Sequence, residues 1–132
     1  MAAYYYPLYQ EALNKGLITG GTNGVNMKFV FVTSGYAYSA ADEFLAAIDE
    51  SYRLQATGNL TDKAFDGLAF DAADPIASAV TGAAVAAVCY YDTGNAETSR
   101  LHSYHAITPV TYAGQDVVIG IDAAGILKAP AA

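Results

Sequence analysis

The chain has 132 residues, of which 54% are hydrophobic and only 14% charged, and its formal net charge is −7. This length predicts one domain. The few cations form no basic patch of the kind that binds nucleic acid or an anionic membrane. No stretch approaches the ~20 apolar residues of a membrane span, and the first ten residues lack the features of a secretory signal.

An ordinary domain has about 25% charged residues, so this chain has few charges with which to cover its exterior. Either its many alanines inflate the apolar fraction, or other subunits cover part of the surface. The eleven tyrosines favour the second interpretation, because Tyr combines a large apolar ring with a polar tip and suits contact surfaces.

The N-terminal segment is aromatic. A run of three tyrosines, Tyr4 to Tyr6, lies next to a chain end, where frayed polar residues are usual. We therefore expect it to be pinned, on its own domain or on a neighbour. Pro7–Asn14 is predicted to be a short helix, because Pro suits the first helical position and Lys15-Gly16 suits a helix end. Gly20–Gly24 is predicted to be a flexible loop.

Strands and one further helix follow. Val25–Thr33 is rich in β-branched and aromatic residues and is predicted to be a strand. Ser39 and Asp42 resemble a capping box, and an apolar stripe follows, so Ala40–Asp49 is predicted to be a helix. Further short strands are expected at Ser51–Ala56, Leu60–Ala64 and Gly67–Asp71, with Ile76–Val80 extended.

The stretch Ala83–Ile107 reads as a strand, an eight-residue loop and a returning strand, and the rest of the chain is expected to be organised around it. Pro109 is expected to end the returning strand and Tyr112–Gln115 to form a turn. Asp116–Asp122 is then predicted to be a strand, and Gly125 to allow a final turn.

Short strands about ten residues apart, with turn residues between them, predict a mainly β fold: an antiparallel sandwich or barrel-like domain with two short helices. We expect an N-terminal arm, short helix and Gly-rich loop over residues 1–24. A single β-rich domain should follow over residues 25–128, and a loose tail over residues 129–132.

Residue types that carry chemistry are present, but in patterns that favour structural roles. His102 and His105 are three apart, which on a regular strand places them on opposite faces and argues against a metal pair. His105 is expected to be a hydrogen-bonded core residue, and the lone Cys89 a buried, inert thiol. The loose acidic cluster lacks the spacing of a calcium loop and is expected to consist of solvated turn residues, Asp62, Asp66, Asp71 and Asp74. We expect no enzyme activity, no metal and no cofactor.

Several segments resemble a group of small tailed-bacteriophage and prophage virion proteins. The resemblance covers roughly Met27–Asp122, and its landmarks are turns and strands. The segments that carry it are Lys28–Val32, Asp42–Leu45, Ala56–Lys63, Phe70–Asp74, Ala79–Gly82, Tyr91–Gly94 and Thr98–Leu101. The N-terminal tyrosines and the Gly-rich loop depart from the pattern.

The resemblance implies a head decoration (cement) protein, made in the host cytoplasm, that binds the major capsid protein on the outer surface of the virion as a homotrimer. Alternatives are a tail or neck component and a carbohydrate-binding module with exposed Tyr platforms. We expect the contact surface to include Tyr4, Tyr5, Tyr6, Leu8 and Tyr9, with Asp92, Thr93 and Asn95 of the Asp92–Ser99 loop second.

Overall fold

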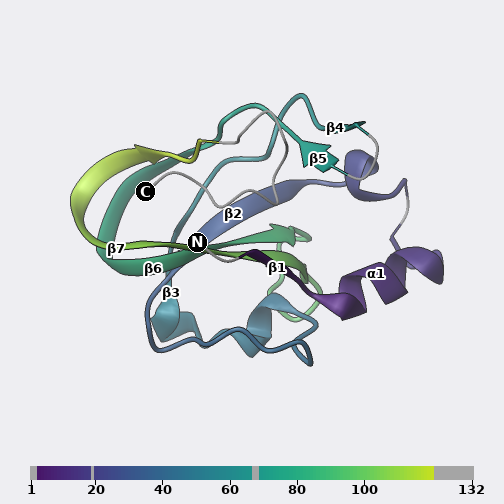
Figure 1. Cartoon of the computed structure of the whole chain (residues 1–132), viewed down its shortest axis with the longest axis horizontal. Coiled ribbons are helices and arrows are strands. Elements are labelled where there is room, and N and C mark those ends of the chain that lie inside the picture. The colour runs from purple at the N-terminus through teal and green to yellow at the C-terminus, as the bar shows by residue number, and fades with distance from the viewer. Residues whose placement is uncertain (1–2, 19, 67–68, 121–132) are drawn as a thin grey trace.

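The computed structural model in Figure 1 describes residues 3–18, 20–66 and 69–120. The predicted final turn and C-terminal tail lie outside the described residues. In chain order the elements are β1 (Ala3–Tyr5), α1 (Pro7–Asn14), η1 (Thr22–Gly24), β2 (Met27–Val32), η2 (Leu45–Ala47), η3 (Glu50–Tyr52), β3 (Arg53–Ala56), β4 (Ala64–Asp66), β5 (Ala69–Asp71), β6 (Ile76–Tyr91) and β7 (Arg100–Val118).

Five strands form one antiparallel sheet in the order β1-β7-β6-β2-β3, and β4 and β5 pair separately. This arrangement confirms the mainly β prediction, whereas closure into a sandwich or barrel is not confirmed. The predicted helix Pro7–Asn14 is α1, with Pro7 in its first turn. The predicted strand over Val25–Thr33 is β2.

The β6–β7 hairpin is the predicted strand, loop and strand, but both strands are longer than expected. β7 does not end at Pro109 and runs on to Val118. Between the pairs Ala86↔Ala106 and Ala84↔Val110, β7 has three residues against one in β6. Pro109 therefore lies in a bulge, where its missing N–H does not interrupt a regular ladder.

The predicted turn at Tyr112–Gln115 is also wrong, because these residues continue β7. Gly114 has a φ of +92° there, and the backbone N–H of Ala113 donates to the Gln115 side chain. The turn residues thus produce a local irregularity inside a strand. The predicted strand Asp116–Asp122 is described as far as residue 120, and its first residues belong to β7.

The far half of the hairpin bends and returns over one face of the sheet (Figure 1). At the bend Gly82 has a φ of +127°, and a Cβ at this position would lie 2.8 Å from the Leu54 side chain of β3. Register shifts on both sides of Val80 accompany the bend. The bend thus depends on a residue without a side chain and on local breaks in strand pairing.

Two apolar cores lie against the sheet. The first core lies between the sheet, the returning hairpin and α1, and it includes Tyr9, Phe29, Phe31, Ala87, Ile107, Val80, Tyr112 and Ile119. The second core includes Tyr6, Val30, Val32, Val88, Leu101, Tyr36, Leu45 and Ile48. Alternate residues of β2 enter different cores, as the period of a strand requires.

The predicted helix Ala40–Asp49 is wrong, because the only helical residues of this segment are those of the short 3-10 helix η2, and a turn at Ala40–Ala41 precedes it. Its backbone bonds to the start of β7 and the preceding loop: Leu45 N donates to Ser99 O at 2.7 Å, and Leu101 N donates to Glu43 O at 2.9 Å. Leu45 and Ile48 are buried as the apolar stripe predicts. The apolar residues are therefore buried without forming a helix, because backbone hydrogen bonds to β7 and to the loop before it replace the hydrogen bonds of a helix.

We predict that Gly82→Ala lowers the free energy of unfolding by about 2 kcal/mol or more, because it adds both an unfavourable positive φ and an overlap with Leu54. Urea unfolding measures the change. Gly94→Ala has a positive φ without a neighbouring atom, and Gly58→Ala has neither feature. Equal losses in Gly82→Ala and Gly58→Ala would contradict this account of the bend.

Candidate functional site

The N-terminal arm, defined here as β1 and α1 with Tyr6 between them, is pinned on its own sheet. Tyr4 lies opposite Tyr104 in the β1–β7 ladder. The N–H of Tyr6 donates to the carbonyl of His102 at 3.1 Å. Figure 1 shows this strand beside β7, with α1 leading away from it.

The five arm residues expected at a contact surface are placed differently from one another. Tyr4 is 47% exposed, whereas Tyr6 and Tyr9 are 0% and 2% exposed and belong to the two cores. Tyr5 and Leu8 are half-buried. A partner that approaches the folded chain can therefore reach Tyr4 and parts of Tyr5 and Leu8, while Tyr6 and Tyr9 hold the arm in place.

Tyr4 belongs to a tyrosine cluster that consists of Tyr4, Tyr6, Tyr36, Tyr38 and Tyr104. The ring of Tyr4 stacks on Tyr38, with centroids 4.9 Å apart and planes 25° apart. The ring centroid of Tyr38 is also 5.0 Å from that of Tyr6 and 5.8 Å from that of Tyr104. The cluster joins β1, β7 and the segment after β2, so the exposed ring of Tyr4 rests on a broad aromatic support.

Hydrogen bonds fix the buried side of this cluster. The hydroxyls of Tyr6 and Tyr36 are 2.6 Å apart, and Tyr36 donates to the Asp42 carboxylate at 2.8 Å. The Tyr38 hydroxyl donates to the carbonyl of Tyr5. Burial raises the pKa of Tyr6 and Tyr36. These phenols are therefore neutral at physiological pH and act as donors and acceptors.

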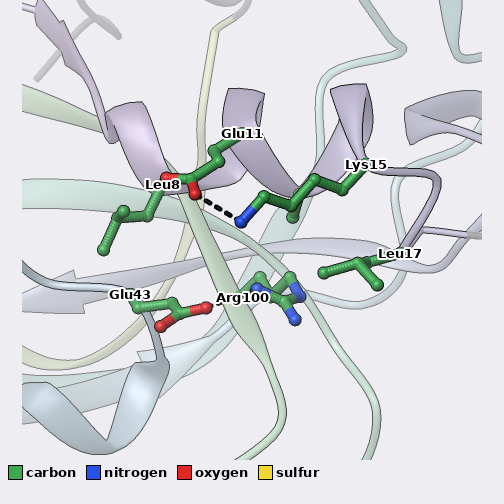
Figure 2. A pocket seen from close by; sticks show the side chains of 7 residues that line it. Leu8, Glu11, Lys15, Leu17, Glu43 and Arg100 are labelled. Atoms are coloured by element: carbon green, nitrogen blue, oxygen red, sulfur yellow. Dashed lines mark hydrogen bonds and ion pairs between the residues drawn. The ribbon is translucent and has the colours of Figure 1, made fainter.

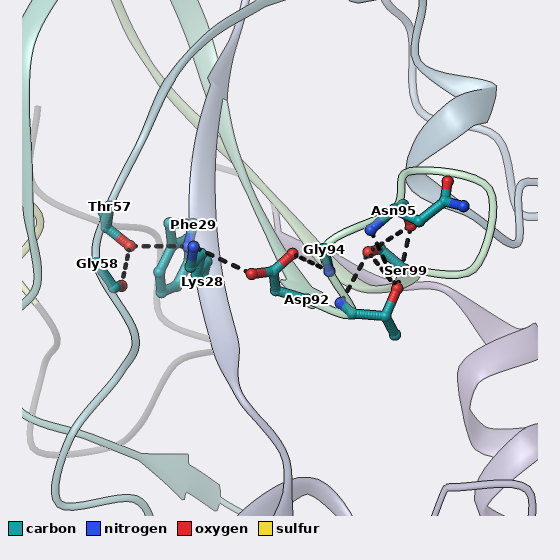
Figure 3. A network of polar contacts seen from close by, with 9 residues as sticks. Lys28, Phe29, Thr57, Gly58, Asp92, Gly94, Asn95 and Ser99 are labelled. Atoms are coloured by element: carbon teal, nitrogen blue, oxygen red, sulfur yellow. Dashed lines mark hydrogen bonds and ion pairs between the residues drawn. The ribbon is translucent and has the colours of Figure 1, made fainter.

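The Asp92–Ser99 loop, the second predicted contact segment, is ordered by its own side chains (Figure 3). Asp92 forms an ion pair with Lys28 at 3.0 Å and accepts from the N–H of Gly94. The Ser99 hydroxyl donates to the carbonyl of Asn95 at 2.9 Å. Thr93 and Asn95 are exposed, whereas Asp92 is half-buried. The loop therefore presents Thr93 and Asn95 on a fixed backbone.

A small cleft lies between α1 and the start of β7, with a volume of about 200 Å³. Figure 2 shows the side chains of Glu11 and Lys15 extending from α1 toward each other, with Arg100 lying beside Glu43. Each cation is paired: Lys15 with Glu11 at 2.6 Å, and Arg100 with Glu43 at 2.7 Å. Arg100 also lies over the ring of Phe44, 4.9 Å from its centroid. The cleft thus has balanced charges.

The two histidines lie on one side of the sheet, which corrects the prediction that they occupy opposite faces. In the ladder, Cys89 pairs with Ser103 and Tyr90 with Leu101, so His102 is an extra residue in β7. This bulge shifts the side-chain alternation by one. The ring of His102 packs against Tyr9 and that of His105 against Phe29, both in the first core.

Ser103 bridges the two histidines. Its hydroxyl is 2.8 Å from Nδ1 of His102 and 2.8 Å from Nε2 of His105. Nδ1 of His105 is buried and has no hydrogen-bond partner among the residues that the structure describes, and a proton there would be a buried, unpaired donor. We therefore assign the proton to Nε2 of His105, which donates to Ser103, and Ser103 donates to His102. His105 is hydrogen-bonded in the core, as the sequence predicts.

Cys89 is fully buried in β6, opposite Ser103. Burial raises the pKa of its thiol, despite the opposing effects of Ser103 and Lys63. A protonated, inaccessible thiol is a poor nucleophile. His102 and His105 are also buried, so the described part of the chain shields all three side chains from solvent.

The prediction of four acidic turn residues is only partly right, because Asp66 lies in strand β4 and Asp71 in strand β5. Asp62 and Asp74 are exposed, and Asp71 lies in β5 opposite Ala64 of β4. Across residues 3–18, 20–66 and 69–120, no group of three or more His, Cys, Asp or Glu side chains is arranged to hold a metal ion. None of the helices in this part of the chain has the length and apolar character needed to cross a membrane.

Comparisons with protein-family models, with curated proteins and with solved structures found no match for this chain. The site must therefore be judged from its own geometry. Two features of it were missed by sequence reasoning: the contributions of Tyr36, Tyr38 and Tyr104 to the tyrosine cluster, and the Glu43–Arg100 pair. Neither has a local sequence signal, because each depends on residues brought together by the sheet.

We predict that acid destabilises the fold through the two histidines. Burial, with a contribution from His105, lowers the pKa of His102 to about 3, and burial lowers the pKa of His105 to about 4. Between pH 6.5 and about 4 the unfolded chain gains protons that the folded chain does not. The free energy of unfolding should therefore fall as pH decreases, by up to about 2.7 kcal/mol per pH unit.

Urea unfolding between pH 7.5 and pH 5, a window above most carboxyl titration, measures this slope. His105→Gln removes one of the two titrating groups and should about halve the slope, whatever its effect on absolute stability. A free energy that is constant between these pH values would contradict the burial of neutral histidines.

Proposed function

We propose that this chain is a structural component of a bacteriophage virion, a decoration protein that binds the outer surface of the head and bridges capsid subunits. The observation that carries the proposal is the exposed ring of Tyr4 on its tyrosine cluster. A large aromatic side chain held by neighbours loses little conformational freedom on binding, which makes it an effective anchor in a protein contact.

Three further residues of the predicted contact surface are at least partly accessible to a partner. Leu8 is half-buried on α1, and Thr93 and Asn95 are exposed on the fixed loop. None of these three carries a charge, in a chain with only 14% charged residues. Uncharged polar and apolar groups are less costly to remove from water than ions, so this surface can be covered by a partner.

The small exposed area of Tyr4 favours a mechanism in which many copies of the protein each bind the capsid weakly. At 47% exposure, Tyr4 offers about 100 Å² of surface, whereas a stable interface buries about 800 Å² on each partner. Tyr4 can therefore be only the centre of a contact. Multiple copies, arranged as homotrimers that each hold neighbouring capsid subunits, would together stabilise the shell.

We predict that Tyr4→Ala weakens binding to purified capsids that lack this protein by about tenfold or more, the effect of losing an interface anchor. Cosedimentation with the capsids measures it. Tyr52→Ala is the matched control, because Tyr52 is also exposed, at 38%, but lies outside the cluster. Equal binding by Tyr4→Ala and the unchanged chain would exclude this anchor, and no binding by the unchanged chain would exclude the function.

A tail or neck component would use the same kind of surface. Electron microscopy of particles separates the two positions, because decoration copies would cover the whole head whereas neck copies would form a single closed ring.

A carbohydrate-binding module is the second candidate, and the stack of Tyr4 on Tyr38 is the observation that favours it. A sugar ring can pack its C–H face on an exposed aromatic face. We predict for this candidate that a soluble glucan or a chitin-derived oligosaccharide binds in calorimetry, that Tyr4→Phe retains binding, and that Tyr4→Ala loses it. Absence of heat at millimolar sugar would contradict the candidate.

A further inference from the structure

The tyrosine cluster has a geometry suited to a chemical modification that is independent of any partner. Each of its five rings has a neighbouring tyrosine ring in the cluster, with centroids 4.9–6.3 Å apart. Tyr4 is the exposed member, Tyr38 and Tyr104 are half-buried, and Tyr6 and Tyr36 are buried. Oxidants in solution therefore reach the cluster through Tyr4.

We propose that Tyr4 and Tyr38 form an oxidative cross-linking site, at which a one-electron oxidant joins the two rings as an intramolecular dityrosine. Their rings are stacked at 4.9 Å with planes 25° apart, closer than the other ring pairs of Tyr4. They belong to segments separated by 33 intervening positions in sequence, so the new bond would tie β1 covalently to the segment that follows β2.

The reaction balances with a peroxide as oxidant. Each phenol loses one electron and one proton and becomes a phenoxyl radical. The two radicals join through the ring carbons next to their C–O carbons, and the hydrogen on each of these carbons moves to oxygen, which restores both phenols. Hydrogen peroxide, activated by a haem peroxidase, takes up the two electrons and two protons and leaves as two water molecules.

The fold favours coupling within the chain over coupling between chains. A pair of reacting groups held in contact has an effective concentration far above that of a protein in dilute solution. Tyr38 is fixed by its hydrogen bond to the carbonyl of Tyr5, and Tyr4 is held opposite Tyr104 in the ladder. When both rings have been oxidised, the two radicals are therefore already in contact and couple with each other before either meets another molecule.

The test treats the full chain, at low micromolar concentration, with a haem peroxidase and hydrogen peroxide. We expect a monomer that has lost the mass of two hydrogen atoms, dityrosine fluorescence, and a cross-linked peptide that contains residues 4 and 38. Tyr4→Phe and Tyr38→Phe should each lose the intramolecular product. Both variants keep the aromatic ring, and circular dichroism before oxidation checks that they are folded.

Tyr52→Phe is the matched control, because Tyr52 is exposed and none of the ring pairs described above includes it. This variant should form the intramolecular product at the same yield as the unchanged chain. The proposal would be overturned if oxidation produced only cross-links between chains, or if the monomer of Tyr4→Phe still lost two hydrogen atoms. Oxidation in urea, where the contact is absent, should replace the single cross-linked peptide with a mixture.

Discussion

The long antiparallel pairing of β6 with β7 is the constraint on which the rest of the structure depends. β6 is the central strand of the five and β7 lies beside it, with β1 and β2 paired on the outer edges of these two strands. Their returning halves also close the first core. One hairpin thus supplies both the platform and part of its cover, which explains how a chain of 132 residues builds two cores.

A bulge in this hairpin determines where the side chains of the candidate site lie. The extra residue His102 turns two histidines toward the first core, and their bridge through Ser103 lies beneath the arm. On the side of the second core, the arm brings Tyr4 onto Tyr38 and Tyr104. A regular ladder would place these side chains differently, because a shift of one residue exchanges the faces of a strand.

Local patterns in the sequence predict the elements whose causes are local. Pro7 and the following stripe define α1, and the β-branched run defines β2. The wrong predictions concern segments whose structure is determined by backbone contacts with residues far away in the sequence. Ala40–Asp49 has the apolar spacing of a helix, but its backbone forms hydrogen bonds with β7. Pro109 is a residue that usually ends a strand, but it lies in a bulge within β7. The tyrosine cluster could be predicted only in part, because Tyr4 is conspicuous in sequence whereas its supports come from other segments.

The position of Cys89 has a practical consequence. This residue is the sole cysteine of the chain and lies fully buried at the centre of the sheet. A thiol reagent can reach it only when the central strands separate, so the rate of labelling reports excursions of the native protein toward open forms. The rate of thiol labelling therefore measures how often the pairing of the central strands opens in the folded protein.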